Sequence, residues 1–156
     1  MKRRLFLGIG FLTIAILLFR DKKVIGAVSP IETIKVLQSD LFSDFTPTNY
    51  LENVILKHTK VQQSEKNFIR NGAGWLNEEA IKLYKLPYTK LSKAKRQIVL
   101  KTISKTTWGD NWLYAMMGYM FESMLGDPIY GINENGSGWS WLEFEAGLPQ
   151  PKKAYL

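Results

Sequence analysis

Few side chains in this sequence could carry out chemistry. The chain has no cysteine and a single histidine, His58, which excludes disulfides, Cys–His catalytic pairs and Cys-ligated zinc or iron–sulfur centres. A metal site would therefore need carboxylates alone. An enzyme acting through carboxylates, for example on a glycan, would depend on four candidates: Glu122, Asp127, Glu143 and Glu145. We predict that the chain is not an enzyme on its own and holds no catalytic, cofactor-binding or metal-binding residues.

The N-terminal sequence instead indicates targeting. A cationic start is followed by an uncharged run, residues 5–19, and then by a charged segment from Arg20, which is the layout of an export signal. Arg3 and Arg4, followed one residue later by Phe6 and Leu7, match the Arg-Arg-x-Phe-Leu pattern of twin-arginine signals. The uncharged run would span about 22 Å as a helix, against about 30 Å for a bilayer core.

We therefore predict that residues 1–27 form a twin-arginine signal peptide or a short anchor, with a general secretory signal as the alternative. Residues 25–27, Ile-Gly-Ala, are only a fair cleavage site. The expected location is the periplasm, and an uncleaved signal would attach the protein to the inner membrane. The partner that this signal implies is the twin-arginine translocase.

The charge distribution argues against nucleic-acid binding. The formal charge is +7, but residues 1–23 contribute +5 of it and leave +2 for the rest of the chain, so no nucleic acid is expected as a partner. Residues 82–105 hold eight basic residues and no acid, whereas residues 106–151 hold six acids and no base. This asymmetry fits either a solvated helix face that balances an acidic tail or an electrostatic docking surface for a partner protein.

Apolar residues recur at helical spacing after the signal. We expect one helix after Ser29-Pro30, a second after Thr46-Pro47 and a third from Ser64. The sequence 71–74, Asn-Gly-Ala-Gly, predicts a break in the third helix, because glycine disfavours a helix interior. A new turn capped by Asn77 would follow the break, with Glu78 and Glu79 at its N-terminus.

Two further helices are expected. Ser92 would cap the first, with Ile98, Val99 and Ile103 on its apolar face. Thr107 would cap the second, which runs to about Leu125. Its apolar stripe is expected in the core, although tryptophan and methionine also mark partner surfaces. The stripe consists of Trp112, Ala115, Met116, Tyr119, Met120 and Met124. The predicted fold is all-α, a small bundle of about five helices spanning residues 28–126, preceded by the signal helix.

The C-terminal segment, residues 127–156, is rich in glycine and proline and is predicted to be irregular. It also holds five aromatic residues: Tyr130, Trp139, Trp141, Phe144 and Tyr155. Disordered segments are poor in aromatic residues, so we expect this tail to be ordered. It would pack against its own helices, against another protein, or against both.

One segment of the tail carries a resemblance to a known family. Residues 127–139 read Asp-Pro-Ile-Tyr-Gly-Ile-Asn-Glu-Asn-Gly-Ser-Gly-Trp. They resemble the hallmark of the gluconate 2-dehydrogenase subunit 3 family, roughly Asp-Pro-x-Tyr-Gly-Gly-Asn-x-x-x-x-Gly-Trp. Ile132 stands where the family often has a second glycine, and residues 145–149 only approximate its Gly-x-Pro-Gly ending.

The resemblance implies a noncatalytic small subunit of a periplasmic, gluconate 2-dehydrogenase-like flavoprotein complex. The small subunit would bind a large FAD-containing dehydrogenase subunit and escort it through twin-arginine export, and a c-type cytochrome subunit would accept electrons. This chain would hold no cofactor; FAD is expected in the partner. The predicted partner-binding residues are Trp112, Asp127, Pro128, Tyr130, Gly131, Asn133, Gly138, Trp139 and Trp141. The alternative is an independent periplasmic helical protein with a binding or structural role.

Overall fold

The computed structural model describes residues 28–42, 49–147 and 152–153, and these residues form helices and turns without a strand. The main helices are α2 (Pro30–Leu41), α3 (Gln63–Tyr84), α4 (Lys93–Ile103) and α5 (Thr107–Leu125). A short π-helix, η1 (Leu51–Leu56), precedes α3, and a 3-10 turn, η2 (Tyr88–Lys90), joins α3 to α4. The predicted all-α fold is confirmed, while the expected signal helix and the expected helix start at Thr46-Pro47 lie outside the described residues.

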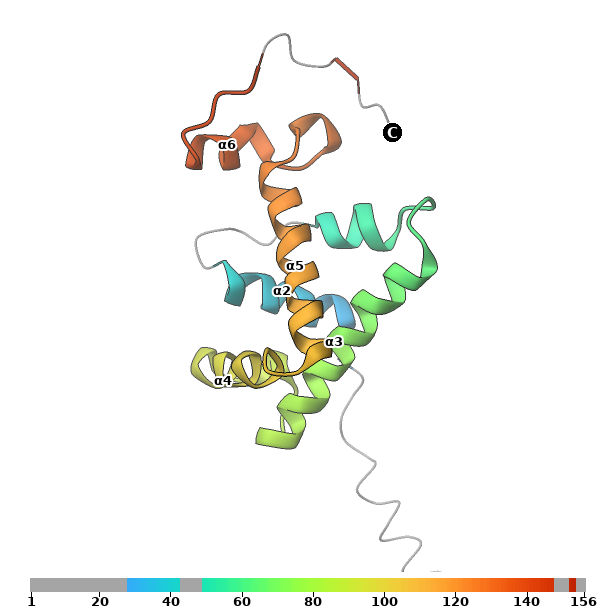
Figure 1. Ribbon diagram of the computed structural model, residues 1–156, viewed down its shortest axis with the longest axis vertical. Helices are drawn as coiled ribbons and strands as arrows, with labels where there is room; N and C mark the ends of the chain where they lie inside the picture. Colours follow the sequence, from blue (N-terminus) through green and yellow to red (C-terminus); the bar gives the residue numbers. More distant parts are fainter. Residues whose placement is uncertain (1–27, 43–48, 148–151, 154–156) are drawn as a thin grey trace, which may run out of the picture.

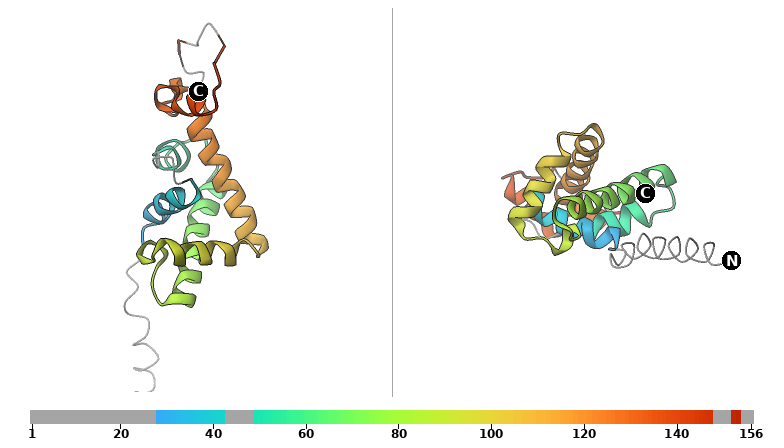
Figure 2. Two further views of the ribbon diagram at one scale, coloured as in Figure 1. Left: turned by 90° about the vertical axis from the view of Figure 1, so that its left-hand side faces the viewer. Right: turned by 90° about the horizontal axis from the view of Figure 1, so that it is seen from below.

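The helices surround α3, which packs against α2, α4 and α5. Figure 1 shows α5 running along the long axis of the molecule. The end of α3 and the whole of α4 lie near one end of α5, and a short C-terminal helix, α6 (Ser137–Trp141), lies at the other (Figures 1 and 2). None of the described helices is long and apolar enough to cross a membrane.

One apolar core lies where these helices meet. Its fully buried side chains come from all four main helices, and the largest include Leu37, Ile69, Leu76, Val99 and Trp112. Burying an apolar side chain of this size contributes roughly 1.5–3 kcal/mol. In the stripe predicted on the last helix, all four of the Trp and Met residues are buried, which confirms that it faces the core: Trp112, Met116, Met120 and Met124.

The predicted break in the third helix is wrong, because α3 continues through residues 71–74 as one helix. A Cβ at Gly72 would overlap the indole ring of Trp112, which is 0% exposed. Glycine at this position therefore lets α5 approach the α3 backbone closely. The cost of a glycine in a helix interior, about 1 kcal/mol, is offset by the burial of a tryptophan side chain.

Three smaller expectations also change. Asn77 is no helix cap, because it lies inside α3 and is buried, and so Glu78 and Glu79 do not stand at a helix N-terminus. Ile98 is 51% exposed, and Leu100 takes its place on the buried face of α4. The cap of α5 is Thr106 rather than Thr107, since its hydroxyl oxygen accepts a 3.1 Å hydrogen bond from the amide of Gly109.

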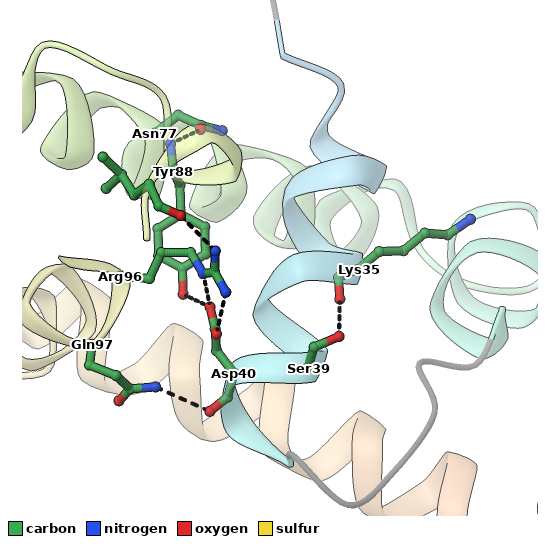
Figure 3. A network of polar contacts seen from close by, with 8 residues as sticks. Lys35, Ser39, Asp40, Asn77, Tyr88, Arg96 and Gln97 are labelled. Atoms are coloured by element: carbon green, nitrogen blue, oxygen red, sulfur yellow. Dashed lines mark hydrogen bonds and ion pairs between the residues drawn. The ribbon is translucent and has the colours of Figure 1, made fainter. Parts of the chain in front are cut away.

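A buried polar network joins α2, α3, η2 and α4 (Figure 3). Arg96 donates from Nε and Nη2 to the two carboxylate oxygens of Asp40, at 2.6 and 2.9 Å, and the hydroxyl of Tyr88 donates to the same carboxylate at 2.7 Å. The amide of Tyr88 donates to Asn77 Oδ1 at 3.0 Å, and Asn77 Nδ2 donates to Thr33 Oγ1 at 2.7 Å. Burial, followed by the bond to Asp40, raises the pKa of Tyr88 above its ordinary value.

Candidate functional site

The candidate site is the segment that follows α5, residues 127–147, which we call the tip. It contains two 3-10 turns, η3 (Pro128–Tyr130) and η4 (Glu134–Gly136), and the helix α6. The segment is thus more regular than predicted. It packs against the end of α5, so the described part of the tail rests on its own helices, one of the alternatives left open by the sequence.

The tip is attached to α5 through the carbonyl groups at the end of that helix. The last carbonyls of a helix lack intrahelical partners. The amide of Asn133 donates to the carbonyl of Ser123 at 2.9 Å, and the indole N–H of Trp139 donates to that of Leu125 at 2.7 Å. Asn133 Nδ2 donates to the carbonyl of Gly126 at 3.0 Å. Two residues of the family-like motif therefore complete the hydrogen bonding of α5.

Asn133 is the centre of this attachment. It is buried and has a left-handed backbone, φ 47°, a conformation that asparagine tolerates better than most residues. Its Oδ1 accepts a 2.7 Å bond from the amide of Gly138. A Cβ at Gly138 would overlap the carbonyl oxygen of Met124. Asparagine and glycine at these two positions let α6 approach the end of α5.

The first turn of the tip uses the other motif residues. Asp127 Oδ1 accepts a 3.0 Å bond from the amide of Ile129, and Pro128 begins η3. Gly131 then ends this turn with φ 73°, a left-handed conformation that glycine adopts without strain. Tyr130, the last residue of η3, is half-buried. These residues shape the turn that leads from α5 to Asn133.

The outer surface of the tip is apolar and acidic. Leu142 is 50% exposed and Phe144 is 56% exposed, and Trp141 beside them is exposed to a similar extent. Phe144 packs edge-on against Trp139, with ring centroids 6.3 Å apart. The same segment carries three exposed carboxylates: Glu134, Glu143 and Glu145.

The structure brings together eight of the nine residues predicted to bind a partner, since all from Asp127 to Trp141 lie in the tip. Asn133 and Gly138 are buried, and they act by holding the tip together. Trp112 lies apart, in the core against Gly72, and we leave it out of the candidate surface. Arg3, Arg4, Phe6 and Leu7 lie outside the described residues.

The sequence alone does not identify Leu142 and Phe144 as surface residues. The available signal was a cluster of large apolar residues in a glycine-rich segment with acids around it. Without the position of α6, that cluster could equally have been core, because exposure depends on which side of the segment rests on α5.

The candidate catalytic carboxylates have different surroundings. Glu122 Oε2 accepts a 2.8 Å bond from the hydroxyl of Tyr50, Asp127 closes its own turn, and Glu143 and Glu145 are exposed on the tip. The hydroxyl of Tyr119 donates to Glu65. Burial and these carboxylates raise the pKa of both tyrosines above their ordinary values. Among the described residues, no group of three or more His, Cys, Asp or Glu could hold a metal ion.

The fold and the tip define an all-helical protein whose C-terminal segment closes one long helix and displays an apolar surface. The model of the gluconate 2-dehydrogenase subunit 3 family matches residues 42–147, which covers most of the helices and the tip. The chain belongs to this family. Membership indicates a subunit of a gluconate dehydrogenase complex, an oxidoreductase that has other subunits. No curated protein and no solved structure matched the chain.

Proposed function

We propose that this chain is the noncatalytic small subunit of a periplasmic flavoprotein dehydrogenase complex. It binds the large FAD-containing subunit, which oxidises a sugar or sugar acid, and carries that subunit through the twin-arginine pathway. A c-type cytochrome subunit then accepts the electrons. Family membership supports a role beside other subunits, and the Arg3-Arg4 pattern supports export of folded cargo.

The observation that carries the proposal is the construction of the tip. The motif residues hold the segment on α5 by internal hydrogen bonds, so the exposed apolar side chains stand on a fixed support. Large exposed apolar side chains grouped together mark interaction sites on proteins that are otherwise soluble. Leu142 and Phe144, together with the exposed acids of the same segment, therefore suit a partner surface that offers apolar and basic groups.

The binding surface can be tested by changing Leu142 and Phe144 to serine together. We expect the double variant to lose co-purification with a flavin-containing large subunit by about tenfold or more, because contacts at the centre of an interface contribute most of the binding energy. Tyr114→Ser is the matched control, since Tyr114 is 77% exposed on α5 and outside the tip. Equal recovery of the flavoprotein with the double variant and the control would show that the tip is not the binding surface.

An independent periplasmic protein remains the second candidate, and one observation favours it: the tip folds on α5 within this chain alone. After gentle extraction, a protein with this role would be recovered as a monomer without a flavin-containing partner. Recovery of flavin absorbance with the wild-type chain would exclude this candidate.

A further inference from the structure

A second charged surface lies near the other end of α5, away from the tip. Six exposed lysines occupy the end of α3, η2, α4 and the residues just after α4, and we call them the basic face: Lys85, Lys90, Lys93, Lys95, Lys101 and Lys105. Lys82 stands beside them and forms an ion pair with Glu79. Within the described part of the chain, the six lysines form no ion pair. Their charge is therefore available to an anionic surface.

Exposed apolar side chains lie in the same part of the chain as these lysines. Leu83, Leu86 and Ile98 are each more than two-fifths exposed, although nearby helix positions hold buried leucine and valine. Lys95 Nζ lies 5.2 Å from the ring centroid of Tyr84. This contact joins the end of α3 to the start of α4. On α4, Ile98 and Lys101 follow helical spacing on the side away from the buried Val99 and Ile103. The basic face thus combines exposed lysines and exposed apolar residues at one end of the molecule.

This composition suits a lipid surface better than a protein surface. Lysine is depleted from protein–protein interfaces. Surfaces that rest on membranes combine lysines, whose apolar stems lie along the interface, with leucine or isoleucine that enters it. Each lysine near an anionic bilayer contributes roughly 1 kcal/mol of attraction.

The sequence before α2 places a membrane within reach. The uncharged run ends at residue 19 and α2 begins at Pro30. The ten residues between them span at most about 33–36 Å when fully extended. If an uncleaved signal stays in the bilayer, the domain cannot leave the membrane surface by more than about this distance.

We propose that the basic face lies on the anionic phospholipid headgroups of the membrane that receives the protein. The proposal rests on the proposed export function for its location, and on the exposed lysines and apolar residues for the contact itself. The 19 residues of α5 span about 28 Å. With the basic face on the membrane, the tip points away from the lipid and is open to a large soluble partner.

The experiment uses the full chain with vesicles and needs no flavoprotein, so its failure is distinct from a failure of the proposed function. Because the chain has no cysteine, Ile98→Cys and Ser140→Cys each allow one polarity-sensitive fluorophore, on the basic face and on the tip. Vesicles contain phosphatidylcholine with or without phosphatidylglycerol, together with a spin-labelled quenching lipid. We expect quenching at position 98 with the anionic vesicles, several-fold less with phosphatidylcholine alone, and little at position 140.

The charge is tested in the Ile98→Cys background. Lys93→Gln, Lys101→Gln and Lys105→Gln together should lower the affinity for anionic vesicles by about tenfold or more. The matched control, Lys60→Gln, Lys152→Gln and Lys153→Gln, removes the same charge from exposed positions elsewhere and should retain the quenching. Equal losses in the two variants, or equal quenching at positions 98 and 140, would overturn the proposal. Unchanged quenching in the variant that lacks Lys93, Lys101 and Lys105 would also overturn it.

Discussion

At the scale of single residues, two glycines of α3 are separated by one position and have opposite surroundings. Gly72 faces the indole ring of Trp112, whereas nothing lies within 4 Å of a Cβ at Gly74. We expect Gly72→Ala to lower the free energy of unfolding by roughly 1–3 kcal/mol, because the added methyl group forces Trp112 out of its packing. Urea unfolding followed by tryptophan fluorescence measures this change.

Gly74→Ala is the control for that substitution. Alanine favours a helix interior by roughly 0.5–1 kcal/mol over glycine, and the position is exposed. The variant should therefore be slightly more stable than the wild type. If both variants were equally stable, the close packing of α5 on Gly72 would be refuted as the reason for a glycine there.

The same pair of residues shows where sequence reasoning fails and why. Helix propensity is local, and it predicts a break at two glycines regardless of their neighbours. The packing partner, Trp112, lies 40 positions away in the sequence, and its location is set by the tertiary fold. The periodic apolar residues of α2 and α5, in contrast, predict helices that the structure confirms, because periodicity reports the buried face directly.

At the scale of elements, the Asp40 network joins α2 to α4 and makes stability depend on pH. The pKa of Tyr88 in the folded chain is raised above its ordinary value of about 10 by burial and by Asp40. Its contribution to stability is complete below pH ~10 and is lost as the pH rises above that value, since the unfolded chain then releases the proton first.

We therefore expect the free energy of unfolding to fall as the pH rises from about 10 to about 11 (values at and just above the ordinary tyrosine pKa). The free energy of unfolding of the Tyr88→Phe variant should fall less steeply over this range, because the substitution removes one of the groups that ionises only on unfolding. Urea unfolding at several pH values gives both slopes. Identical slopes would contradict the assignment of Tyr88 to this network.

The join between α5 and the tip depends on Asn133. Asn133→Gly keeps the left-handed backbone but removes the side-chain bonds to the Gly126 carbonyl and the Gly138 amide. We expect amide hydrogens of the tip and of the last turn of α5 to exchange about tenfold faster or more, because leaving buried polar groups unpaired costs roughly 1–3 kcal/mol.

Asn135→Gly is the matched control for the tip, since Asn135 is exposed and also has a left-handed backbone, φ 54°. Its exchange rates should stay near those of the wild type. Unchanged exchange in Asn133→Gly would mean that Asn133 does not hold the tip. The sequence shows the motif as a family resemblance. Its bonds to the last carbonyls of α5 cannot be predicted from the sequence, because they depend on where that helix ends in the folded chain.

At the scale of the whole molecule, the elements that carry the two surfaces lie at opposite ends of α5: α6 at one end, and α4 with the end of α3 near the other (Figure 1). The acidic and apolar tip is proposed to bind the flavoprotein, and the basic face is proposed to rest on lipid. The charge asymmetry of the sequence predicts that basic and acidic residues gather separately, but it does not give their distance. That separation comes from α5, which begins after the last lysine of the basic face and ends at the tip.

The central claim is that this subunit carries a folded flavoprotein out of the cytoplasm, and the direct measurement is the location of that flavoprotein. Arg3→Lys with Arg4→Lys retains the charge but removes the arginine pair that the pathway requires, and Arg20→Lys is the control. Flavin-dependent dehydrogenase activity is then measured in the periplasmic and cytoplasmic fractions. We predict that the double variant leaves the activity in the cytoplasm, whereas the control exports it. Activity in the periplasm of the double variant would contradict the account.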